Sequence, residues 1–152
     1  SDLITPHFEV EDNVIPAANS VMASVLFKLS IHFENPYFEK ISQQMLQHII
    51  PTIDYPSAFS NWLNLLLNFS EQQKEIAICG EKAIEFATKI NQHYFPNILV
   101  AGSKTESSLP FLTNRFMENE TLLYLCQNRT CQKPTDNLEE IIIDLKSNHK
   151  FL

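Results

Sequence analysis

The chain contains only two glycines, and each one stands directly after a short, unbroken apolar run. Residues 76–79 (IAIC) end at Gly80, and residues 98–101 (ILVA) end at Gly102. Uninterrupted apolar runs of this length are typical of strands that are covered on both faces of a sheet. Because residues 81–94 between the runs have helical periodicity, the pattern predicts a βαβ unit with two parallel strands.

The sequence after this unit predicts one more strand and one more helix. Residues 121–126 form a third apolar run, and residues 137–147 have an apolar helical face preceded by Asp136 as the expected N-cap. We expect all three strands to share one sheet. The long polar loop 102–120 between them is either functional or disordered, because loops of this length are uncommon in compact domains.

The first part of the chain predicts three helices, at residues 20–31, 36–49 and 57–69, with Ser57 as the expected cap of the third. The first of these is apolar on most sides, so we expect it and the third helix to expose apolar surface and to support self-association. The expected fold is therefore α/β: three N-terminal helices in residues 1–70, packed on a small βαβ-βα unit in residues 71–152.

Composition excludes several classes of function. The 152 residues carry 18 acidic and 11 basic side chains, a formal charge of −7, which argues against binding to nucleic acid or to an anionic membrane surface. Two glycines are too few for a Walker loop or a dinucleotide fingerprint, and the turn at Gly80 needs no bound anion to explain it. We expect no cofactor, and three cysteines without an amino-terminal signal favour the cytoplasm.

The acidic residues and the histidines form no pattern that is specific to catalysis or metal binding. Glu9, Glu11 and Asp12 lie close together and could do acid–base work, but acids ahead of a helix are also what the helix dipole favours. No histidine has a partner at metal-ligand spacing, so we predict no metal site. The histidines are His7, His32, His48, His93 and His149.

Cys126 and Cys131 have the one spacing that stands out. They are five residues apart, so their sulfurs can meet only if the chain turns sharply, and Asn128 is a suitable turn residue. The spacing is neither a Cys-x-x-Cys redox motif nor a complete zinc half-site. Two hypotheses stay open for this pair: a dithiol that bridges on oxidation, or two structural thiols. We expect Cys79 to be buried and alone.

Several stretches together resemble one family. They are residues 13–20 (NVIPAANS), 76–80, 93–97 (HYFPN), 109–112 (LPFL) and 124–134 (YLCQNRTCQKP). These segments are similar to the thioredoxin-domain-containing proteins related to spermatogenesis-associated protein 20, and the last segment is the most specific. Ala17 and Ala18 depart from the family pattern, which has Ser and Gly there.

The resemblance implies a larger parent protein with a thioredoxin-like domain, an (α/α) toroid of the six-hairpin glycosidase type and a small α/β tail. This chain would be the last toroid helices and the tail, and its partner would be the remainder of the parent. No complete active site is expected in it. A link to carbohydrate metabolism would place a set of residues at the toroid rim: Glu9, Glu11, Pro16, Asn19 and Ser20.

Three functional hypotheses follow. The chain is a non-catalytic structural segment of that parent, whose molecular function is unknown; or its rim residues complete a sugar-binding cleft; or Cys126 and Cys131 form a redox accessory that exchanges with the thioredoxin-like domain.

Overall fold

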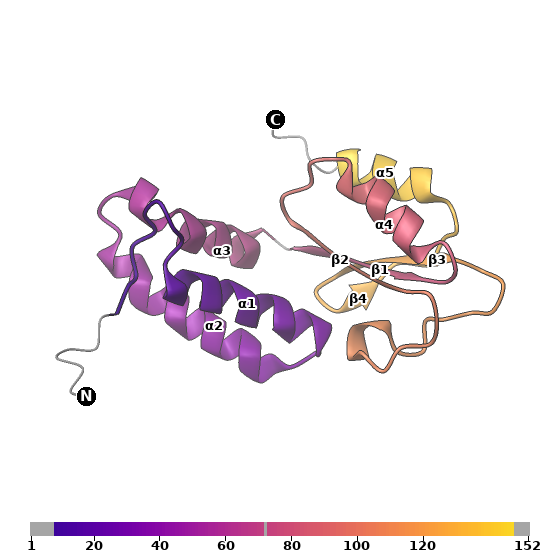
Figure 1. Cartoon of the computed structure of the whole chain (residues 1–152), viewed down its shortest axis with the longest axis horizontal. Helices are drawn as coiled ribbons and strands as arrows, with labels where there is room; N and C mark the ends of the chain where they lie inside the picture. Colours follow the sequence, from indigo (N-terminus) through magenta and orange to yellow (C-terminus); the bar gives the residue numbers. More distant parts are fainter. Residues whose placement is uncertain (1–7, 72, 148–152) are drawn as a thin grey trace. The chain divides into compact units, whose positions relative to one another are not determined.

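The computed structural model describes residues 8–71 and 73–147, and the chain divides into two compact units, Ser1–Ser70 and Glu71–Leu152 (Figure 1). The first unit contains α1 (Ala18–His32), α2 (Pro36–Ile49) and α3 (Ser60–Ser70). Single 3-10 turns at Ile50–Thr52 and Pro56–Phe59 connect α2 to α3. The chain thus has the expected α/β fold, with helices preceding a small sheet.

The core of the first unit forms where the three helices meet. Its fully buried apolar residues are Ala23, Phe27, Leu46, Phe59, Trp62 and Leu65. The buried Ser42 hydroxyl on α2 donates to the Ala23 carbonyl on α1 over 2.7 Å, so small residues allow these two helices to approach closely. The indole N–H of Trp62 donates to the Val10 carbonyl over 2.8 Å, which ties the segment before α1 to the same core.

The start of the third helix differs from the prediction. Ser57 is exposed inside the 3-10 turn, and α3 begins three residues later, at Ser60. The carboxylate of Asp12 accepts from the backbone N–H of Asn61 over 2.8 Å. The expected Ser57 cap was wrong because a side chain from outside the helix satisfies this N-terminal amide.

The second unit is built on one four-stranded sheet of order β2-β1-β3-β4. Its elements are β1 (Lys74–Cys79), α4 (Ala83–Asn91), β2 (Ile98–Ser103), β3 (Leu122–Gln127), β4 (Thr130–Cys131) and α5 (Leu138–Ser147). The strands β1 and β2 are parallel, while β3 pairs antiparallel with both β1 and β4. The expected single sheet is confirmed, but the short strand β4 was not predicted.

The two faces of this sheet are covered differently. On one face α4 and α5 lie side by side over Ile76, Ile78 and Leu123 (Figure 1). On the other face Phe111 and Leu112, from a 3-10 turn in the long loop, pack against Ala77, Cys79 and Cys126. The loop therefore supplies the second covered face that the unbroken apolar run of β1 requires.

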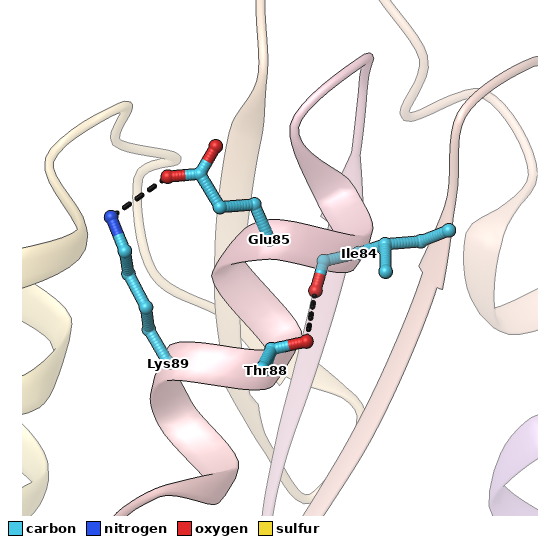
Figure 2. A network of polar contacts seen from close by, with 4 residues as sticks. All are labelled: Ile84, Glu85, Thr88 and Lys89. Atoms are coloured by element: carbon cyan, nitrogen blue, oxygen red, sulfur yellow. Dashed lines mark hydrogen bonds and ion pairs between the residues drawn. The ribbon is translucent and has the colours of Figure 1, made fainter.

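Local contacts stabilise the two helices of this unit. On α4 the Lys89 ammonium donates to the Glu85 carboxylate over 2.8 Å, and the Thr88 hydroxyl donates to the Ile84 carbonyl (Figure 2). On α5 the Asn137 side chain, not Asp136, accepts from the first free amides of the helix. The sequence placed this cap one residue too early.

Candidate functional site

A tight hairpin brings Cys126 and Cys131 together. Asn128 and Arg129 both have positive φ, of 52° and 62°, which is the geometry of a two-residue type I′ turn between β3 and β4. Cys126 is directly opposite Cys131, their Cα atoms are 3.9 Å apart, and their sulfurs form a disulfide. The expected turn at Asn128 and an approach within the roughly 7 Å that a bridge needs are both confirmed.

The pair occupies a particular position in the ladder. The Gln132 N–H donates to the Leu125 carbonyl over 2.9 Å, one residue beyond the cysteines on each strand. The cysteines therefore form a non-hydrogen-bonded pair, in which opposite Cα atoms are closest, at about 4.5 Å in regular ladders.

Arg115 stands beside the disulfide, although it is eleven residues away from Cys126 in an irregular loop. Its Nη1 is 3.3 Å from Cys126 Sγ. The guanidinium lies over the rings of Phe111 and Tyr124, 5.0 and 5.1 Å from their centroids, and the Tyr124 hydroxyl donates to the Arg115 carbonyl. No spacing rule links Arg115 to the cysteines, so the sequence did not reveal it.

The two sulfur-bearing residues differ in exposure. Cys126 is 1% exposed and belongs to the core under the loop, whereas Cys131 is partly exposed on the edge strand β4. A shallow depression of about 280 Å³ also touches this hairpin. Cys126 and Cys131 both line this depression, together with Leu125, Gln127 and Thr130, whose side chains alternate to the face opposite the cysteines.

Cys79 is buried and free, as expected. Burial raises the pKa of its thiol, and the Glu106 charge acts in the same direction while the Arg115 charge opposes it. A buried thiol with a raised pKa is a poor nucleophile, so Cys79 contributes packing and not chemistry.

The expected rim residues do not form a group of converging polar side chains. Glu9, Glu11 and Pro16 are exposed, and the Asn19 amide donates to the Glu9 carbonyl over 2.8 Å. Ser20 is fully buried and donates to Asp12. Asn19 also lines a mainly apolar hollow of about 300 Å³ with residues that include Phe8, Met45 and Trp62.

Asp12 is the residue of this acidic segment that the structure uses. It is 6% exposed, and its carboxylate accepts from the Ala17 N–H, the Ser20 hydroxyl and both the backbone and side-chain N–H groups of Asn61. Burial alone would raise the pKa of Asp12, but these hydrogen bonds outweigh it and hold the pKa below its ordinary value. This carboxylate is structural, because its acceptor positions are engaged within the fold.

A larger cleft of about 1030 Å³ lies where β1 ends and β3 begins, and both basic and acidic side chains line it. The Gly80 N–H donates to the Ser103 carbonyl, and the Lys82 N–H donates to the Thr121 hydroxyl. Gly80 has φ +133°, and a Cβ there would collide with the backbone of Glu120 and Thr121. These contacts account for the glycine by the turn itself, without a bound anion.

His7 and His149 lie outside the described residues, which are 8–71 and 73–147. Within that part of the chain no group of three or more His, Cys, Asp or Glu side chains could hold a metal ion. None of the helices described there is both long enough and apolar enough to cross a membrane.

Comparison with known proteins identifies no relative of this chain. No protein-family model matches the chain, and no match was found among the curated proteins or the solved structures.

Proposed function

We propose that the unit formed by residues 71–152 is a redox accessory in which Cys126 and Cys131 exchange reversibly between disulfide and dithiol. The observation that carries the proposal is the cross-strand disulfide at the edge hairpin, with one sulfur buried beside Arg115 and the other residue partly exposed. Cys131 is therefore the more open of the two residues to attack by a thiolate, although its side chain also packs against the core under the loop, and access is one of the factors that set exchange rates.

A purely structural staple is the weaker interpretation. By chain entropy a bridge closing so short a loop adds only about 2 kcal/mol. The type I′ turn and the β3–β4 ladder already close this loop, so the bridge has still less to contribute. If the protein is cytoplasmic, as its cysteine count favours, a disulfide there would be transient and functional rather than permanent.

The reaction partner is proposed to be a protein dithiol. One partner thiolate attacks the Cys131 sulfur, a mixed disulfide forms, and the electron pair of the broken bond passes to Cys126. The second partner thiol loses its proton and attacks the mixed disulfide, which leaves the partner oxidised and both cysteines of this chain reduced. The thioredoxin-like domain expected from the family resemblance has the chemistry for this role.

The test is to place the full chain in glutathione redox buffers of graded potential and to count alkylated thiols by mass spectrometry. We expect Cys126 and Cys131 to open and close together while circular dichroism stays native, and Cys79→Ser to behave like the wild type. A pair that opens only in denaturant would leave a staple as its role. A pair that never closes would leave two structural thiols.

The first unit supports a second, structural proposal. Val21, Met22 and Val25 make an apolar stripe on α1, and they are 44%, 53% and 41% exposed. We infer that this stripe packs against further helices, as in the end of the toroid expected from the resemblance, and that the remainder of such a parent is its partner. The sugar-rim hypothesis has no comparable support, because its residues do not converge on a polar cleft.

A further inference from the structure

We propose that Arg115 directs the exchange by making Cys126 the leaving sulfur and the thiolate of the reduced pair, so that partners attack Cys131. This inference rests on the proposed redox function. It gives Arg115 a direct catalytic role, because the guanidinium contacts the reacting sulfur, and it predicts the order of bond changes, which the proposed function alone does not.

Arg115 already contacts the Cys126 sulfur while the disulfide is closed. A disulfide sulfur is only a weak hydrogen-bond acceptor, yet Nη1 of Arg115 is 3.3 Å from Cys126 Sγ. When the bond opens and negative charge collects on that sulfur, the same contact becomes an ion pair between the guanidinium and a thiolate, which the neutral disulfide sulfur cannot form. Arg115 thus stabilises the product of the step more than the starting disulfide.

The Arg115 guanidinium is already held in place before the disulfide opens. The Phe111 and Tyr124 rings lie against it, and the Tyr124 hydroxyl fixes its backbone carbonyl over 3.0 Å. Phe111 is 3% exposed, so this support belongs to the core under the loop. Because Arg115 does not have to be ordered when the thiolate appears, little entropy opposes the stabilisation.

Other charged and titratable groups also lie around Cys126. Glu75 is its cross-strand neighbour on β1, and a carboxylate there opposes thiolate formation. Tyr124 precedes it on β3, and burial raises the pKa of that phenol, as does the Cys79 charge. The Glu106 charge raises the pKa of the Cys79 thiol. The Arg115 guanidinium is in direct contact with the sulfur, so we expect its charge to outweigh these opposing groups.

A partner thiolate forms a bond to Cys131 Sγ, the bond between the two cysteine sulfurs breaks, and its electron pair stays on Cys126 as a thiolate against Arg115. In the reverse direction this thiolate attacks the mixed disulfide at Cys131 and releases the partner thiolate. No further oxidant or reductant takes part.

The experiment compares the 152-residue wild-type chain with Arg115→Gln and Arg115→Lys. The matched control is Lys133→Gln, which removes an exposed cation two residues beyond Cys131. The oxidised proteins react with glutathione under pseudo-first-order conditions, and acid-quenched mixed disulfides are mapped by mass spectrometry. We expect glutathione on Cys131 and a free thiol on Cys126. Because a leaving thiol of lower pKa departs faster, Arg115→Gln should slow opening, by about three- to tenfold. Arg115→Lys should restore most of the rate.

Thiolate absorbance against pH in the reduced proteins, each carrying Cys79→Ala, gives a readout that a merely structural role would not move. The apparent pKa of the pair should be higher in Arg115→Gln than in the wild type or Lys133→Gln. Equal opening rates and equal titrations in Arg115→Gln and the wild type would overturn this inference and leave the redox function intact. A wild-type disulfide that no thiol opens in native buffer would overturn the redox function itself. Should Arg115→Gln fail to fold, the same comparison is made with Arg115→Lys in high salt, which should screen the remaining contact and slow opening.

Discussion

At the scale of single residues, Asp12 shows how one buried carboxylate can organise a segment without regular structure. It links the chain before α1 to the first turns of α1 and α3, through Ala17, Ser20 and Asn61. Its neighbours Glu9 and Glu11 are exposed and make no comparable set of contacts. Acids that look equivalent in the sequence therefore differ completely in role.

We predict that Asp12→Ala lowers the free energy of unfolding by about 2–3 kcal/mol, because hydrogen bonds to a buried charge are lost and their donors remain. The matched control Glu11→Ala, at an exposed acid, should change it by less than about 0.5 kcal/mol. Urea unfolding monitored by circular dichroism measures both. Equal effects of the two substitutions would show that the Asp12 contacts do not stabilise the fold.

The pH dependence follows from the lowered pKa of Asp12. A carboxyl whose pKa is lower in the folded state stabilises the protein above its unfolded pKa, near 3.9, and this contribution is lost as the pH falls through the lower folded value. The stability difference between wild type and Asp12→Asn should therefore be full at pH 6 and should shrink below about pH 4. A difference that is unchanged between pH 6 and pH 3 would contradict it.

At the scale of elements, α5 shows how far a capping pattern can be taken from sequence. Asp136 and Asn137 are both good N-cap residues and are adjacent, so composition cannot choose between them. In the structure the Asn137 side chain accepts from the amides of Glu139 and Glu140, and the Thr135 hydroxyl accepts from the Asn137 N–H. The path of the chain from the Thr135–Leu123 bridge decides which side chain faces the helix end.

We predict that Asn137→Ala destabilises the protein by about 1 kcal/mol, the usual cost of losing an N-cap. Asp136→Ala, which removes the neighbouring candidate, should cost less than about 0.5 kcal/mol. Thermal unfolding of both variants tests the assignment, and a larger loss from Asp136→Ala would reverse it.

At the scale of the whole molecule, the exposed stripe of Val21, Met22 and Val25 bears on association. The sequence predicted exposed apolar surface on α1 and on the third helix, and Leu67 on α3 is also 46% exposed. Contiguous apolar surface on a protein usually marks a contact with another molecule or domain.

We predict that the isolated chain self-associates through this stripe. Sedimentation velocity should show a concentration-dependent increase in mass for the wild type, and the triple substitution Val21→Ser, Met22→Ser, Val25→Ser should abolish it. Tyr37→Ser, at a 64% exposed aromatic residue on α2, is the control and should leave association unchanged. A wild type that stays monomeric at millimolar concentration would contradict the prediction.

Much of this architecture is determined by local pattern. The two glycine-terminated apolar runs predicted two parallel strands, and Asn128 predicted a turn, because both signals depend on backbone conformation within a few residues. Cover on both faces holds for β1 only, because β2 is an edge strand and is only partly buried. The tertiary structure decided the rest. It added β4, whose two residues are too few to show any periodicity, and placed Asp12 at the start of α3 and Arg115 against Cys126. These contacts join residues 49 and 11 positions apart, and no spacing in the chain encodes them, because packing against a shared core brings their segments together.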